Sequence, residues 1–406
     1  MQLQVLQCKH WIAVLLIAFS VNGFIFSQQS SSPRSIQVSY ERNFIRSDLA
    51  GKTDVLEDAA TDENAPEFIG GLYELSLRFS LQYAALLSDD PDMVSLTLFA
   101  VQGAGRSGLP GGTSLLTEIF STYRNNLIRV ETLGALSLLG KGSHEASLFI
   151  NGFILDQNAR YRSGMNADYA VISAAISALS VLGSESSFAA LFSVMTSGYP
   201  NTIIEEASLA LSSIEGDFCG YLIEVIENNA AAEKYAAFRA GAHNGKFTVA
   251  ERGSLAETAL RVALEKQPAN SEEEQIFLEL RYLAAPVLRE LAWVRSADAV
   301  LQHFYQTQRE YRTGNSTIAQ YREAIACLGA MGNNDAVQAL ALQLGYINSR
   351  TERREEFDDS LTMEVVNALG AIGDKVAFDY LLYMSYLPYS EQIQSAAREA
   401  LNKLKW

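Results

Sequence analysis

From residue 66 to the C-terminus, apolar residues recur every three or four positions along almost the whole chain. This spacing predicts one amphipathic helix after another. We expect helices near 68–87, 92–103, 112–124, 127–139, 143–155, 168–182, 185–197, 203–215, 218–229, 231–243, 248–266, 271–284, 286–308, 317–331, 333–345, 361–372, 374–385 and 391–404. Pro91 and Pro286 are placed at helix starts. Residues 36–40 alternate like a short strand. The pattern is that of an all-α protein.

One phrase recurs within this pattern: a helix rich in small residues and leucine, a glycine, a short polar turn and another apolar helix. Its copies end at Gly140, Gly183, Gly216, Gly332 and Gly373. The spacing is that of a unit of two helices, 43 residues from Gly140 to Gly183 and 41 from Gly332 to Gly373. The closing glycine supplies a left-handed residue, and the next Asp, Asn or Ser caps the following helix. Glycines inside the helices, Gly134, Gly329 and Gly370, predict close approach of neighbouring helices.

The clearest copy, residues 365–377, reads VVNALGAIGDKVA and resembles the HEAT repeat family, whose units commonly carry A-L-G-x-[IL]-G-D-x-x-A. The resemblance covers roughly residues 66–406, although 218–285 are degenerate and their helix pairing is ambiguous. It implies a right-handed α-solenoid of HEAT-type helix pairs, about eight or nine in number. It also implies a binding scaffold, because the family mostly supplies such scaffolds.

The N-terminus has the pattern of a secretory signal peptide. Lys9 and His10 precede an apolar run over 11–19, and Ser27 ends a mixed stretch. We therefore expect a signal peptide over 1–27, with Ser20 and Gly23 as other cleavage sites. A polar, acidic segment over 28–65 and the array over 66–406 follow. A membrane-anchoring N-terminal helix is the alternative. The expected location is secreted or periplasmic, in a bacterium, with no stable membrane span after cleavage.

The net charge of the chain indicates which class of partner it binds, and the sequence around the cysteines indicates where they lie. The chain has 31 Lys and Arg against 47 Asp and Glu, a net charge of −16. Nucleic-acid binding needs a basic surface, so we expect no nucleic acid and instead a protein or peptide partner with a basic patch. Cys219 and Cys327, the cysteines beyond the signal, stand in apolar helical surroundings and are predicted to be buried.

Motifs for catalysis and cofactors give no site. Residues 103–108 form G-x-G-x-x-G, but Leu109 and Pro110 interrupt the helix that a dinucleotide fold needs, so we interpret the segment as a glycine turn between helices. His144–Glu145 is a single His-Glu pair, and H-E-x-x-H, G-x-S-x-G and the P-loop do not occur. We assign no catalytic, cofactor or metal residue. An enzyme or a small-ligand or metal binder using 218–285, and a structural component of the cell envelope, remain alternatives.

Candidate partner-binding residues come from loops within the helix pairs. The loops expected to be enlarged are 156–167, 198–202, 309–316, 346–360 and 386–390, and in a solenoid such loops fall along one edge. They carry tyrosine and arginine, the residues that dominate interface hot spots. The candidates are Tyr161, Arg162, Tyr199, Tyr311, Arg312, Tyr346, Arg350, Arg353, Arg354, Tyr386 and Tyr389. Alternatively, the charges neutralise one another and the tyrosines pack on their own helix ends. The sequence thus predicts a non-catalytic interaction scaffold with a binding ridge.

Overall fold

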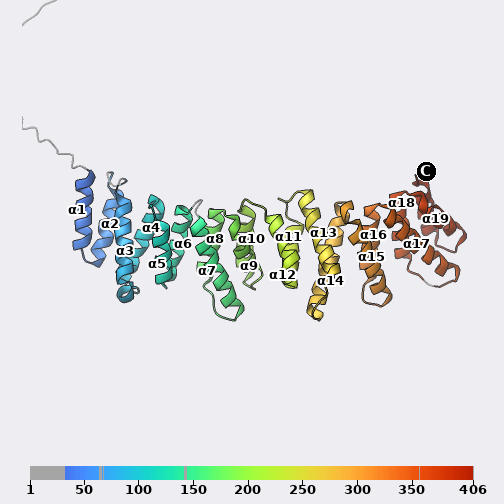
Figure 1. Cartoon of the computed structure of the whole chain (residues 1–406), viewed down its shortest axis with the longest axis horizontal. Coiled ribbons are helices and arrows are strands. Elements are labelled where there is room, and N and C mark those ends of the chain that lie inside the picture. Colours follow the sequence, from blue (N-terminus) through green and yellow to red (C-terminus); the bar gives the residue numbers. More distant parts are fainter. Residues whose placement is uncertain (1–32, 64–65, 67, 141–143, 356, 406) are drawn as a thin grey trace, which may run out of the picture.

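The computed structural model describes residues 33–63, 66, 68–140, 144–355 and 357–405. Twenty α-helices follow one another through these ranges, and no β-strand forms there, so the all-α prediction is confirmed. The helices stand side by side as an elongated array (Figure 1). The expected signal peptide over 1–27 lies outside the described residues.

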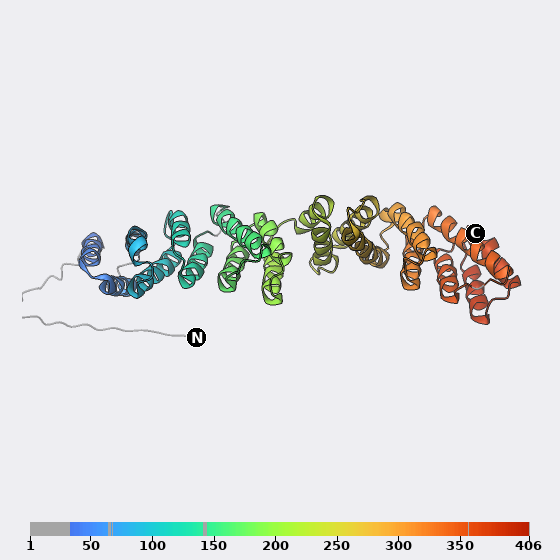
Figure 2. The same cartoon turned by 90° about the horizontal axis from the view of Figure 1, so that it is seen from below.

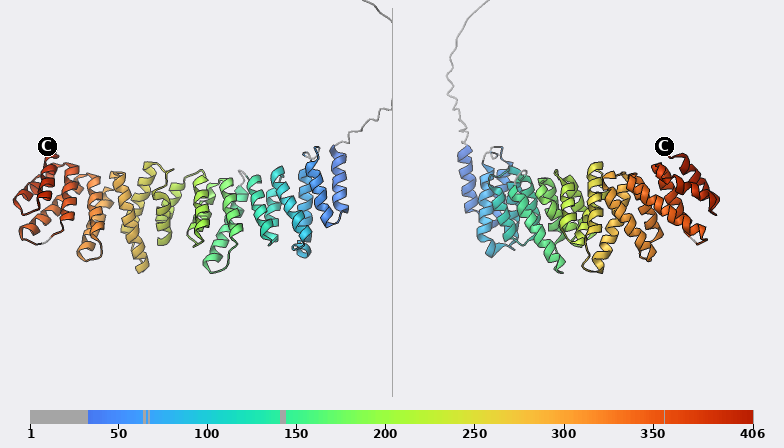
Figure 3. Two further views of the ribbon diagram at one scale, coloured as in Figure 1. Left: turned by 180° about the vertical axis from the view of Figure 1, so that it is seen from behind. Right: turned by 45° about the vertical axis from the view of Figure 1, so that its right-hand side comes forward.

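The helices form two rows, because most helices pack on the next one and, except at one step, each packs on the next but one (Figures 2 and 3). The odd row contains α1 (Pro33–Arg46), α3 (Ile69–Leu87), α5 (Gly112–Thr122), α7 (His144–Arg162), α9 (Phe188–Met195), α11 (Phe218–Asn228), α13 (Val249–Glu265), α15 (Ala297–Arg312), α17 (Asn334–Glu352) and α19 (Phe378–Tyr383). The even row contains α2 (Leu49–Thr61), α4 (Pro91–Ser107), α6 (Asn126–Leu139), α8 (Tyr169–Leu182), α10 (Asn201–Ser213), α12 (Ala231–Ala242), α14 (Ser271–Glu290), α16 (Ile318–Met331), α18 (Asp359–Ile372) and α20 (Glu391–Asn402).

Three of the five copies of the repeated phrase end in the expected left-handed glycine, whereas Gly140 has a φ of −89° and Gly216 lies beyond the end of α10 at Ser213. Gly183, Gly332 and Gly373 close α8, α16 and α18 with φ of 63°, 62° and 72°. These left-handed values suit glycine. Asn333 then caps α17 by accepting from the backbone N–H of Ala336. Asp374 accepts in the same way from Val376, so the turn chemistry is confirmed after Gly332 and Gly373, whereas Ser184 after Gly183 makes no such cap.

Close helix approach in the even row depends on glycine facing alanine. A Cβ built on Gly329 would lie 2.8 Å from the Ala368 Cβ, and one on Gly370 would lie 2.8 Å from the Ala400 Cβ. The packing role predicted for these two glycines is confirmed. It is wrong for Gly134, which is exposed and has no atom within 4 Å of such a Cβ.

Where α4 packs on α6, the glycine that allows the close approach is Gly105, which belongs to the G-x-G-x-x-G segment. A Cβ on Gly105 would lie 2.9 Å from the Cα of Ala135. Helix α4 continues through Ser107 before Gly108 ends it, so most of this segment is helix rather than turn. A helix also precedes the motif where a dinucleotide fold has a strand.

Two further predictions about local structure are wrong. Residues 36–40, expected as a strand, belong to α1, and Phe44 of that helix is 1% exposed in the core. Burial of one face against neighbouring helices overrides the short β-like pattern. Pro286, placed at a helix start, lies inside α14, which continues to Glu290.

The degenerate middle region forms two regular pairs, α11 with α12 and α13 with α14. The exception to the two-row packing is the step from α9 and α10 to α11 and α12, which aromatic rings bridge. Phe188 of α9 lies 5.1 Å from Phe218 of α11, and Phe192 lies 5.9 Å from Tyr221, between ring centroids. A seam of aromatic rings therefore joins the two parts of the array.

Candidate binding surfaces

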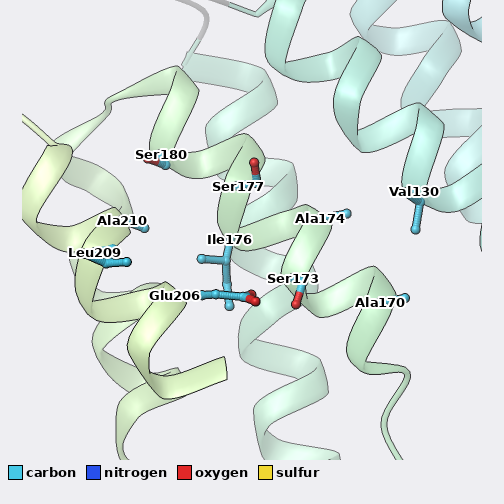
Figure 4. A pocket seen from close by; sticks show the side chains of 10 residues that line it. All are labelled: Val130, Ala170, Ser173, Ala174, Ile176, Ser177, Ser180, Glu206, Leu209 and Ala210. Atoms are coloured by element: carbon cyan, nitrogen blue, oxygen red, sulfur yellow. The ribbon is translucent and has the colours of Figure 1, made fainter. Parts of the chain in front are cut away.

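A groove opens on the exposed side of three even-row helices, α6, α8 and α10 (Figure 4). Its volume is about 580 Å³. Helix α8 forms the floor with Ile176 and, for the most part, small side chains. These are Ala170, Ser173, Ala174, Ser177 and Ser180.

Aliphatic side chains stand beside this floor. Leu209 of α10 lines the groove and is 70% exposed, and Val130 lines it from α6. On the same face of α6, at helical spacing from Val130, Leu127 and Leu138 are 65% and 58% exposed. The surface is apolar without being covered by another part of the described chain.

Charge distribution distinguishes this groove from the rest of the even row. Glu206 is the one ionisable residue in its lining. Further along, ion pairs cross the row, with Arg289 Nε 2.9 Å from Glu323 and Arg322 Nη2 3.1 Å from Glu364. The groove thus combines a small-residue floor, aliphatic walls and a single negative charge. We call it the α8 groove.

The loops expected to be enlarged are shorter in the structure, because the helices extend into them. Tyr161 and Arg162 belong to α7, Tyr311 and Arg312 to α15, and Tyr346 and Arg350 to α17. Helices α7 and α15 end only where Gly164 and Gly314 take φ of 87° and 79°. In Figure 1, α7, α14 and α15 reach beyond their neighbours at the lower edge.

At the end of α7, the tyrosines pack on one another. The Tyr161 and Tyr199 rings stack with centroids 4.2 Å apart, and Tyr199 is only 3% exposed. Burial raises the pKa of Tyr199 to about 12. Arg162 donates to the Ser193 hydroxyl at 3.0 Å. This group stabilises a helix end and leaves little of Tyr199 for a partner.

Near the end of α17, the structure brings several other candidates together. The Arg312 guanidinium lies 4.9 Å from the Tyr346 ring centroid. Arg350 and Arg353 both pair with Glu355, at 3.0 and 3.4 Å. This self-neutralised arrangement matches the alternative interpretation of these charges.

The remaining candidates differ in their surroundings. Tyr311 lies 5.2 Å from the Tyr321 ring, and Tyr389 donates to Asn348 Oδ1 at 2.8 Å, so both tyrosines are engaged within the protein. Tyr386 is 75% exposed, and Arg354 lines a hollow of about 490 Å³ together with Tyr389. The candidates therefore form separate clusters on different helix ends.

Three side chains with reactive groups lie in the core of the described chain. Cys219 and Cys327 are buried and free, as predicted. Burial raises the pKa of Cys219 to about 11 and that of Cys327 to about 12, so neither is an activated thiolate. His303 is fully buried, and this burial lowers its pKa to about 3. Among the described residues, no group of three His, Cys, Asp or Glu is placed to hold a metal ion.

Comparison with known proteins adds no family. No protein-family model matches the chain, and a search of curated proteins finds no match. Within the described ranges, every helix is too short or too polar to cross a membrane.

The α8 groove is the surface that the sequence-based reasoning missed. Its signal is present in the sequence, because residues 169–182 read YAVISAAISALSVL without a single charge. A helix without charge on any side is usually fully buried. In the two-row array, one face of α8 stays open.

Proposed function

We propose that this chain is an exported, non-catalytic scaffold that binds a protein or peptide partner in the α8 groove. The supporting architecture is a right-handed α-solenoid of HEAT-type helix pairs, as the resemblance of residues 365–377 implies. The signal-like N-terminus supports a secreted or periplasmic location in a bacterium.

The observation that carries this proposal is the uncovered apolar surface along α6, α8 and α10. Exposed leucines beside a hollow of small side chains mark interaction sites in soluble proteins. A partner side chain or helix face can enter because the floor residues project so little. The acidic chain and Glu206 favour a partner with a basic patch.

The experiment blocks the groove without removing any internal contact. Ser177 lies exposed on the floor, so Ser177→Trp fills the hollow. The matched control is Ser114→Trp, at an exposed position of α5 in the other row. Wild-type, Ser177→Trp and Ser114→Trp proteins are used to capture partners from an extract of the native cell envelope.

We expect the wild type and Ser114→Trp to capture the same protein and Ser177→Trp to lose it, with equal helicity by circular dichroism. Equal recovery by all three proteins would contradict binding in the α8 groove.

A further inference from the structure

Residues of α17 and α19 line a second pocket. The two helices stand near the C-terminal end of the odd row (Figure 1). The volume of the pocket is about 430 Å³, within the range of small-ligand pockets. Gly345 on α17 keeps it open. A Cβ at Gly345 would lie 2.9 Å from Cε1 of Tyr380, a ring that lines the pocket.

Two carboxylates line this pocket, and neither forms an ion pair within the described chain. Glu352 comes from the last turn of α17 and Asp379 from the first turn of α19. The described chain places no arginine or lysine within ion-pair distance of either one. Of the three arginines closest to Glu352 in sequence, Arg350 and Arg353 pair with Glu355, and Arg354 lines the separate hollow beside Tyr389.

Tyr383 orients the Glu352 carboxylate and offers an aromatic surface to a ligand. The Tyr383 hydroxyl donates to Glu352 Oε1 at 3.0 Å, and this hydrogen bond raises the pKa of Tyr383. Tyr383 is 40% exposed, so part of its ring stays accessible. The pocket therefore presents an oriented carboxylate next to exposed ring surface.

This combination matches the chemistry of a guanidinium group. Arginine stacks its planar guanidinium on aromatic rings and donates paired N–H groups to a carboxylate. We propose that the α17–α19 pocket binds an arginine side chain of the partner protein, stacked on tyrosine and paired with Glu352 and Asp379. The inference rests on the proposed function only in that a protein partner supplies this arginine.

Because the pocket is to be tested alone, the probe is a single amino acid derivative. N-acetyl-arginine amide is titrated into the full chain, and saturation-transfer NMR measures its Kd. N-acetyl-citrulline amide has nearly the same shape without the charge. The test variant is Glu352→Gln with Asp379→Asn. The control, Glu118→Gln with Glu224→Gln, removes two exposed charges elsewhere.

We expect saturable binding of the arginine derivative to the wild type and the control, about tenfold or more weaker in the test variant. The citrulline derivative should not saturate. Absence of saturable arginine binding, equal binding of citrulline, or equal Kd values in all three proteins would overturn the inference. The α8 groove is unaffected by that result, because Ser177→Trp tests it separately on α8.

Discussion

Replacement of Gly329 by alanine should destabilise the protein, although alanine is the better helix former. Within a helix, alanine is favoured over glycine by about 0.8–1.0 kcal/mol. The new Cβ would lie 2.8 Å from the Ala368 Cβ, which is fixed to the α18 backbone and cannot rotate away. Overpacking of this kind costs about 1–3 kcal/mol. The net effect is a loss of up to about 2 kcal/mol.

Gly134 provides the matched control, because it also lies inside an even-row helix but has no atom within 4 Å of a new Cβ. Gly134→Ala should therefore stabilise the protein by about 1 kcal/mol. Urea unfolding followed by circular dichroism at 222 nm gives the order of midpoints, with Gly134→Ala highest and Gly329→Ala lowest. Adding Ala368→Gly to Gly329→Ala removes the clash and should show a favourable coupling of about 1–3 kcal/mol. Equal midpoints for the two alanine variants would refute the glycine–alanine contact.

Two buried ionisable groups give further predictions. Burial lowers the pKa of His303 from 6.5 to about 3, so the imidazole takes up a proton more readily in the unfolded chain than in the folded one. The free energy of unfolding therefore decreases as the pH falls from about 6.5 towards 3. His303→Leu should flatten this part of the stability curve, measured by urea unfolding between pH 7 and 4; an unchanged slope would contradict it. Lys234, 4% exposed, donates from Nζ to the Ile226 carbonyl at 2.6 Å. Lys234→Met should cost about 1–3 kcal/mol by leaving that carbonyl unpaired, whereas exposed Lys266→Met should change the urea midpoint little; equal midpoints would contradict this role.

Local capping chemistry made much of the fold predictable from sequence. The glycines at 183, 332 and 373 need only a left-handed residue at a helix end, which a single position encodes. Gly134 and Gly329 look alike in sequence, yet only Gly329 faces an alanine of the next even-row helix. That difference depends on how neighbouring pairs are rotated, which no local pattern contains.

The candidate binding surfaces were harder to predict, because they too depend on how neighbouring helix pairs pack. The tyrosine and arginine candidates near the ends of α7, α15 and α17 remain a prediction as binding residues, and several of them contact one another. Helix length could not be judged from spacing alone, because the polar residues 156–162 look like a loop in the sequence, yet α7 continues to Arg162. The α8 groove is formed by three separate helices, and only their packing brings Val130, Ser177 and Leu209 together.

Site-specific photo-crosslinking tests the central claim most directly. A benzophenone amino acid is placed at Ser177 on the floor of the α8 groove or at Ser114 on α5, and the protein is irradiated in its native cell envelope. Binding in the groove predicts a discrete crosslinked protein from position 177 and none from position 114. The same crosslinked products from both positions, or none from position 177, would contradict the account.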